Sequence, residues 1–206
     1  MRYLLLPRFI LAALLSGLTA CQGTFVPDPV DPRLPRISSE GADAAGAFVN
    51  GQQWSAVRVG GWSNGDGLEG NLWLSVDSTQ HTVRMTIDGQ LETRPGEAGD
   101  LLQITFILDN ADGGLDQFTG LRGQTFALDG PHRAVVAGPF WQEEGTVSER
   151  SRTGQLYIHS LEPVQKDLSV SYYLAGTFSF VIDCTGCTPY DVQSGRFDYE
   201  VEGYTP

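Results

Sequence analysis

The chain has 206 residues, with 13 Lys and Arg against 25 Asp and Glu, and a formal net charge of -12. This length suits one domain with a hydrophobic core, and 41% hydrophobic residues exclude a disordered chain. A nucleic-acid binder is disfavoured, because neutralising phosphates needs clustered cations and the chain has a single lysine, Lys166. The 25 glycines and 11 prolines favour many turns between short strands.

Residues 1–20 have the layout of an export signal. Arg2 and Arg8 provide a positive start, an apolar run from Phe9 to Leu18 follows, and small residues come next. The run is too short to cross a bilayer, since a spanning helix needs about 20 apolar residues. The sequence therefore predicts an exported protein.

The signal ends in Leu18-Thr19-Ala20-Cys21, which resembles the lipobox of bacterial lipoproteins. The resemblance implies cleavage before Cys21, a diacylglycerol on its thiol and, in many cases, an acylated amino group. A thiolate is nucleophilic enough to take the lipid. Two or three acyl chains hold a protein stably at a membrane, whereas one does so only marginally. The alternatives are an ordinary secreted protein whose Cys21 follows an Ala-x-Ala-like cleavage site, or a buried core Cys.

The lipid is expected to hold the protein at the membrane without help from charge. Removal of Arg2 and Arg8 with the signal leaves 11 basic residues against 25 acidic ones, a formal charge of -14. An anionic bilayer repels such a domain. Gln22 stands where an Asp often retains lipoproteins at the inner membrane, so the resemblance implies the outer membrane, on its periplasmic or surface face.

Residues 21–46 are predicted to be the lipidated Cys and a proline-rich tether. Pro27, Pro29, Pro32 and Pro35 fix φ and lack an N–H donor, so we expect an extended linker without a packed core. At about 3.1 Å per residue, such a linker would hold the domain some tens of Å from the membrane. A proline-rich ligand for another domain is the alternative.

Residues 47–206 are predicted to form a single all-β domain, because apolar and polar residues alternate. The alternation is clear in 83–87, 102–108, 178–182 and 197–201. About eight to eleven short strands then bury their inner faces against each other, which predicts an antiparallel β-sandwich or a small barrel. Turn signals separate the strands: Asn50-Gly51, Asn64-Gly65-Asp66-Gly67, Asp88-Gly89, Asp112-Gly113-Gly114 and Asp129-Gly130.

Two regions near the ends of this domain carry a family resemblance. The first is Phe48-Val49-Asn50-Gly51-Gln52-Gln53-Trp54-Ser55-Ala56. The second is Leu174-Ala175-Gly176-Thr177-Phe178-Ser179-Phe180 with Ser194-Gly195-Arg196-Phe197-Asp198. They resemble a family of uncharacterised, β-rich Bacteroidetes-type lipoproteins. The two regions lie at the ends of residues 47 to 202, and the resemblance implies a β-rich fold at the cell envelope. Proteins of this family have no assigned activity.

Cys184-Thr185-Gly186-Cys187 is the local motif that points most specifically to a chemistry. A redox pair of this spacing lies at a helix N-terminus after a strand, whereas here both flanks are strand-like. In an oxidising envelope we expect Cys184 and Cys187 to form a disulfide worth about 2 kcal/mol. Zinc binding and redox catalysis are the alternatives. Zinc would need two more ligands, and His81, His132 and His159 show no paired spacing.

An acidic loop places Asp109, Asp112 and Asp116 beside two glycines. Calcium binds to hard oxygens of this kind. The spacing differs from the D-x-[DN]-x-[DN]-G pattern and lacks a final Glu, so we prefer a solvated turn capped by its own side chains, with calcium as the alternative. We predict no cofactor.

Aromatic side chains suit either core packing, which we prefer, or a platform that stacks on sugar rings. Trp62 and Trp141 are the candidate ligand-stacking residues, and Trp62 lies among glycines from which a loop could present it. The full set considered is Trp54, Trp62, Trp73, Trp141, Tyr172 and Tyr173.

The sequence carries no Gly-x-Ser-x-Gly, His-Glu-x-x-His or phosphate-cradling loop. Glu143 and Glu144 are neighbours and would point to opposite faces of a strand, so they cannot act as a paired acid and base on one substrate. The leading hypothesis is a non-enzymatic, lipid-tethered envelope module that binds a glycan or an envelope protein, or has a structural role. A carbohydrate-binding lipoprotein of a glycan-uptake system is the first alternative. A hydrolase of envelope polymers is the second, and it would need a cleft that brings together distant carboxylates such as Asp77, Glu92 or Glu162.

Overall fold

A computed structural model of the chain describes residues 27–56, 72–77, 82–94, 97–109, 119–137, 149–165, 170–183 and 188–202. Within these ranges it has ten strands and one 3₁₀ turn, η2 (Thr119–Leu121). No helix in this part of the chain has the length and apolar character needed to span a bilayer. The strands are β1 (Ala44–Val49), β2 (Gln52–Ser55), β3 (Leu72–Asp77), β4 (Thr82–Arg94), β5 (Glu97–Asp109), β6 (Thr125–Ala127), β7 (Arg133–Ala137), β8 (Glu149–Gln165), β9 (Val170–Ile182) and β10 (Tyr190–Glu202).

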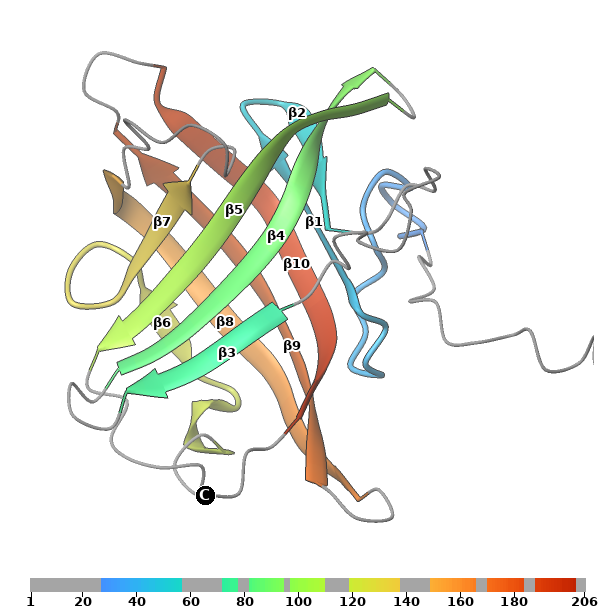
Figure 1. Ribbon diagram of the computed structural model, residues 1–206, viewed down its shortest axis with the longest axis vertical. Helices are drawn as coiled ribbons and strands as arrows, with labels where there is room; N and C mark the ends of the chain where they lie inside the picture. The colour runs from blue at the N-terminus through green and yellow to red at the C-terminus, as the bar shows by residue number, and fades with distance from the viewer. Residues whose placement is uncertain are drawn as a thin grey trace, which may run out of the picture.

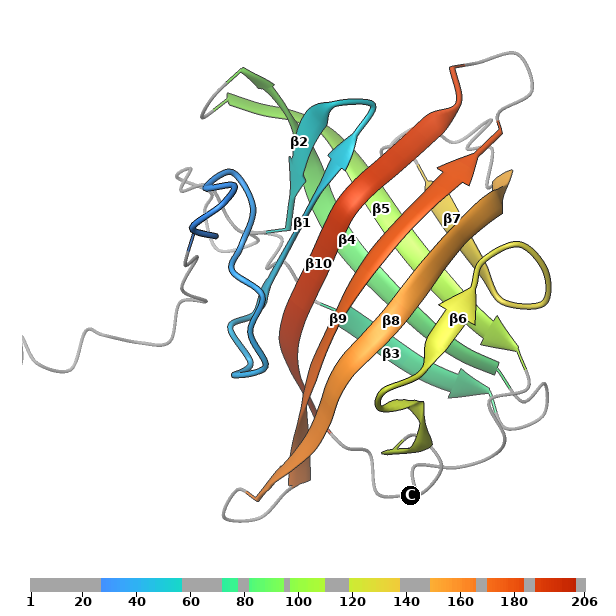
Figure 2. The ribbon, with the colours of Figure 1, turned by 180° about the vertical axis from the view of Figure 1, so that it is seen from behind.

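The strands form one antiparallel sheet that closes into a barrel-like shape (Figures 1 and 2). The order is β2-β1-β10-β9-β8-β7-β5-β4-β3, and a further pairing of β2 with β4 joins the two sides. β3 pairs with another part of β4, and β6 pairs with β8. The prediction of an all-β sandwich or small barrel is confirmed, with the barrel as the form adopted. Closure leaves fewer free strand edges.

Several strands are longer than the short strands expected from the sequence. β8 has 17 residues, and β4, β5, β9 and β10 have 13 each. Long strands can coil around a barrel when bulges bend them, and β8 and β10 both contain register shifts. The sequence suggested shorter strands because a bulge interrupts the strict alternation of apolar and polar residues.

Two of the predicted turns are confirmed and one is wrong. Asn50 and Gly51 have φ angles of 51° and 80° and join β1 to β2 in a two-residue hairpin loop. Asp129-Gly130 lies between β6 and β7. Asp88-Gly89, in contrast, lies inside β4, where Gly89 leaves room for the ring of Trp54. The other two turn signals include residues outside the described ranges.

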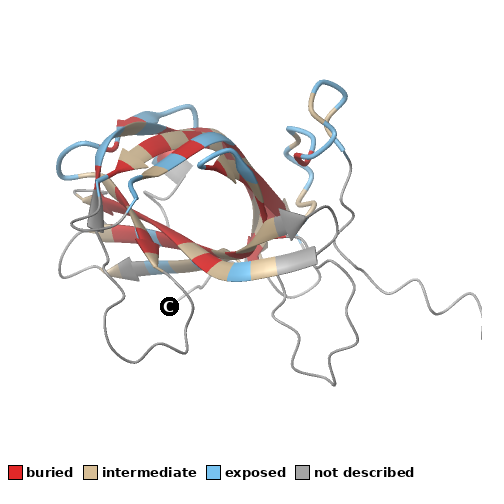
Figure 3. Ribbon diagram, turned by 90° about the horizontal axis from the view of Figure 1, so that it is seen from above, coloured by how far each residue is buried: buried red, intermediate tan, exposed pale blue. Residues whose placement is uncertain are grey.

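Apolar side chains fill the inside of the barrel, and buried residues alternate with more exposed ones along the strands (Figure 3). Trp54 is fully buried, and its Nε1 donates to the Leu102 carbonyl over 2.9 Å. A Cβ at Gly89 would lie 2.5 Å from that Nε1. The predicted inner faces are confirmed by the buried residues Val83, Met85, Ile87, Leu102, Ile104, Phe106, Leu108, Phe178, Phe180, Ile182, Phe197, Tyr199 and Val201.

Residues 27–43, which we call the strap, pack on the outside of the barrel beside β1 and β10 (Figure 2). The linker expected here was to have no packed core, yet Leu34 is fully buried. A Cβ at Gly46 of β1 would lie 2.6 Å from Pro35 Cδ. β1 begins at Ala44, before the domain boundary expected at residue 47. The difference arises because prolines supply apolar surface as well as stiffness.

Candidate binding site

A shallow groove of about 240 Å³ lies on the outer face of β8, β9 and β10, where the strap crosses. Successive side chains of a strand point to opposite faces, so the residues that alternate with the core residues of these strands point outward and line the groove. For example, Leu156 is buried between two outward residues of β8. The main lining side chains are Gln155, Tyr157, Thr177, Ser194, Arg196 and, from the strap, Ile37.

A bulge in β10 places Ser194 at the edge of the groove. The register of β10 with β9 shifts between Val192 and Gly195, and Ser194 has a φ of 53°. A non-glycine residue in the left-handed region carries strain on the order of 1–3 kcal/mol, and such residues collect at functional sites. Bulges also redirect side chains. The strain and the groove therefore coincide at one residue.

Arg196 is the charged side chain that lines the groove, and its charge is paired with the strap. Its Nη1 lies 2.6 Å from Asp28 Oδ2 and donates to the Pro35 carbonyl over 3.0 Å. The N–H groups of Asp31 and Val30 donate to Asp28 Oδ1. These two bonds, and then the Arg196 guanidinium, hold the pKa of Asp28 below its usual value. The pairing leaves no unbalanced charge at the groove.

His159 stands beside the groove and contacts two of its lining residues. Its Nε2 lies 3.1 Å from Thr177 Oγ1, and its ring meets the Tyr157 ring edge to face, with centroids 4.5 Å apart. Burial lowers the pKa of His159, so the imidazole is neutral at pH 7. The groove thus offers neutral hydroxyl and amide groups that donate or accept hydrogen bonds, and the neutral imidazole of His159 lies next to them.

Most of the predicted site residues lie outside the residues that the structure describes. The lipid attachment, the stacking pair and the disulfide therefore stay predictions. Glu143 and Glu144 lie outside as well. The site residues concerned are Cys21, Trp62, Trp141, Asp112, Asp116, Cys184 and Cys187.

Asp109 is the described member of the acidic loop, and it forms an ion pair. Its Oδ2 lies 3.0 Å from Arg133 Nη1. Among the described residues, no three His, Cys, Asp or Glu are grouped so that they could hold a metal ion. Of the histidines weighed as zinc ligands, His132 packs edge-on against Phe126 at 5.2 Å, and His81 lies outside the described ranges.

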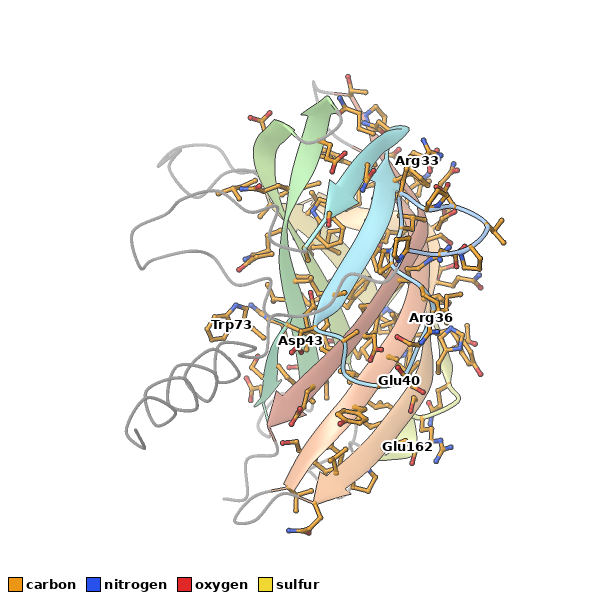
Figure 4. All side chains as sticks on the ribbon, turned by 90° about the vertical axis from the view of Figure 1, so that its right-hand side faces the viewer. Arg33, Arg36, Glu40, Asp43, Trp73 and Glu162 are labelled. Atoms are coloured by element: carbon orange, nitrogen blue, oxygen red, sulfur yellow. The ribbon has the colours of Figure 1, made fainter. Side chains whose placement is uncertain are left out.

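The described aromatics divide between core and surface. Trp54 belongs to the core, as the preferred interpretation of the aromatics predicted. Trp73 on β3 is 60% exposed and points away from the sheet (Figure 4). Tyr172 packs against the core, whereas a Cβ at Gly41 of the strap would lie 2.7 Å from the ring of Tyr173. Trp73 is thus an exposed ring that could stack on a ligand.

Asp77, Glu92 and Glu162 are not brought together as the hydrolase alternative requires. Asp77 is in register with Thr82 at one end of β4, whereas Glu92 lies near the other end of that 13-residue strand. Glu162 belongs to β8 and pairs with Arg122 over 2.6 Å (Figure 4). At about 3.3 Å per strand residue, Asp77 and Glu92 are too far apart to flank one bond.

Comparison of the chain with protein-family models, with curated proteins and with solved structures gives no match. The resemblance to β-rich lipoproteins therefore stays a prediction. The groove itself was not anticipated from the sequence. The alternation places Gln155, Tyr157 and Thr177 at outward positions, but it does not show that these residues of two different strands lie side by side.

Proposed function

We propose that the chain is a lipid-anchored protein of the outer membrane whose barrel is a non-enzymatic binding module. The export signal and the lipobox at residues 18–21 support the anchor. The observation that carries the binding function is the groove of neutral hydrogen-bonding groups beside the charge-paired Arg196. Binding at such a groove needs no cofactor.

An uncharged, hydroxyl-rich ligand is the chemistry that this groove fits best, which favours the carbohydrate-binding alternative. Sugar hydroxyls both donate and accept hydrogen bonds, as do the hydroxyls of Thr177 and Ser194 and the amide of Gln155. The ring of Tyr157 adds an aromatic surface for the apolar face of a sugar. A groove of about 240 Å³ suits the end of a glycan.

The anchor is tested by growing cells with a clickable fatty acid. We expect the full chain to be labelled and to fractionate with the membrane, and Cys21→Ser to be unlabelled. The thioether needs a thiol, so this substitution prevents lipid attachment, and it changes no residue that the structure describes. An unlabelled full chain, or a Cys21→Ser variant that is labelled as strongly as the full chain, would contradict the anchor.

The groove is tested with the Cys21→Ser protein on a glycan array. We expect at least one neutral glycan to bind, and Gln155→Ala to weaken its binding about fivefold, because a lost hydrogen bond costs on the order of 1 kcal/mol. Gln103→Ala is the matched control, since Gln103 is an outward strand residue that instead donates to Asp88. An array without hits, or equal effects of both substitutions, would contradict the carbohydrate proposal.

A further inference from the structure

The strap begins with a turn of fixed shape. We call residues 28–33 the strap tip. Asp28 Oδ1 accepts the N–H groups of Val30 and Asp31 over 2.8 and 3.0 Å. The Asp28 N–H donates to the Leu34 carbonyl over 2.9 Å, and the Leu34 N–H donates to the Asp31 carbonyl over 3.0 Å. Because Leu34 is fully buried and Asp28 pairs with Arg196, the tip is attached firmly to the barrel.

The tip presents apolar side chains to its surroundings. Val30 is 91% exposed, the largest exposure among the big apolar side chains of the described residues, and Pro29 and Pro32 are exposed beside it. A single exposed apolar residue needs no explanation, but three of them on an ordered turn form a small apolar projection. Figure 3 shows the exposed part of the strap on the side away from the barrel.

Charge at the tip is balanced, unlike that of the domain as a whole. The Arg33 guanidinium lies 3.0 Å from Asp31 and 4.5 Å from the centre of the Phe48 ring. Further along the strap, Arg36 and Glu40 form an ion pair with 3.4 Å between Nη2 and Oε2 (Figure 4). An anionic membrane repels an acidic domain, but the repulsion of the strap tip is weak because its charges are paired.

The expected lipid anchor lies close to the tip along the chain. Residues 22–26 alone separate Cys21 from Pro27, which pairs with Pro35 across the base of the tip. At about 3.3–3.6 Å per residue, this stretch reaches at most about 20 Å. Docking of the strap thus replaces most of the long linker expected from the sequence and keeps the tip near the bilayer surface.

We propose that the strap tip rests in the interfacial region of the bilayer, with Pro29, Val30 and Pro32 against lipid, and so fixes which side of the barrel faces the membrane. The inference rests on the lipid anchor proposed above. Acylation supplies most of the affinity, and the exposed apolar atoms of the tip supply orientation. The Asp129 turn between β6 and β7, across the barrel from the strap in Figure 1, then faces away from lipid.

The test uses acylated full-length protein in vesicles of phosphatidylethanolamine and phosphatidylglycerol. Val30→Cys, in a Cys184→Ser, Cys187→Ser background, carries an environment-sensitive dye, and Asp129→Cys is the matched control. Cys21 is blocked by its thioether, so the dye attaches at one place. Both labelled positions are exposed, so neither substitution disturbs the core. We expect a blue shift and quenching by spin-labelled lipid at position 30, and neither effect at position 129.

Intact-mass spectrometry of the same samples separates the two proposals. If Cys21 carries the lipid and the dye at position 30 responds no more than the dye at position 129, the tip does not contact lipid and the inference is wrong, while the anchor stands. If the mass shows a bare Cys21 thiol, the anchor is wrong and the inference fails with it.

Discussion

Gly89→Ala should destabilise the barrel, although an alanine normally suits a strand better than a glycine. Where space allows, this change stabilises a protein by about 0.4–1 kcal/mol, because the unfolded chain loses freedom. At Gly89 the added Cβ would lie 2.5 Å from Trp54 Cζ2 and Nε1. The indole has little room to move, since Trp54 is fully buried and bonded to the Leu102 carbonyl.

Two costs add when the methyl group enters this contact. Overpacking a core costs about 1–3 kcal/mol, and stretching the bond to Leu102 costs about 1 kcal/mol more. After the gain from the unfolded state, we expect a net loss of about 2–3 kcal/mol. With a urea m-value of about 2 kcal/mol/M, the midpoint of unfolding falls by about 1 M.

The measurement is urea unfolding of the unacylated Cys21→Ser protein, followed by circular dichroism. Gly130→Ala is the control, because a Cβ there meets no atom within 4 Å, and its midpoint should hold or rise. In a double-mutant cycle, Trp54→Phe should reduce the cost of Gly89→Ala, since the smaller ring leaves room for the methyl. Equal midpoints for Gly89→Ala and Gly130→Ala would refute the close ring packing on which this reasoning depends.

Three further predictions concern the strap and the core. Asp198→Asn should speed tryptic cleavage after Arg36 several-fold, because Asp198 accepts bonds from Ser38 and from the Glu40 and Gly41 N–H groups; unchanged cleavage would contradict this. The pKa of Asp28 is lowered in the folded protein, so its carboxylate favours strap docking above pH 4, and docking weakens as the pH falls through that lowered pKa. Hydrogen exchange of the strap amides should therefore become faster at acid pH. The Asp28→Asn variant should lack this pH dependence. Tyr199→Phe should raise the free energy of unfolding by about 1 kcal/mol in urea titrations, because the buried Tyr199 hydroxyl has no hydrogen-bond partner within the described part of the chain. A lower free energy of unfolding would contradict this prediction.

The inner faces of the strands could be predicted because they depend on local order along the chain. Alternation placed Val83, Met85 and Ile87 on one face, and all three are buried. The hairpin at Asn50-Gly51 could be predicted for the same reason, since a two-residue loop with positive φ selects these residues whatever surrounds them.

Asp88-Gly89 shows where local reasoning fails. The pair has the composition of a turn, but Gly89 is required for space and not for an unusual φ angle. The ring that needs the space belongs to Trp54 on β2, and β2 meets β4 only when the sheet closes. No rule that reads neighbouring residues can distinguish a glycine of this kind from a turn glycine.

The groove was missed because three strands and a bulge create it together. Gln155, Thr177 and Ser194 come from β8, β9 and β10, and none of them is unusual in its own segment. Only the register of these strands places their side chains together. The positive φ of Ser194, which brings its side chain to the edge, has no signature in the sequence.

The strap shows how one property of a residue can lead to two opposite expectations. Proline lacks a donor and fixes φ, which led to the prediction of an unpacked linker. The same stiffness lowers the entropy that a proline-rich segment loses when it docks. Docking then depends on partners elsewhere, and these are Arg196 and Asp198 on β10; Asp28 and Arg196 are 168 residues apart in the chain. A proline-rich stretch therefore remains a linker only where the folded domain offers no matching surface, and that surface is a property of the fold.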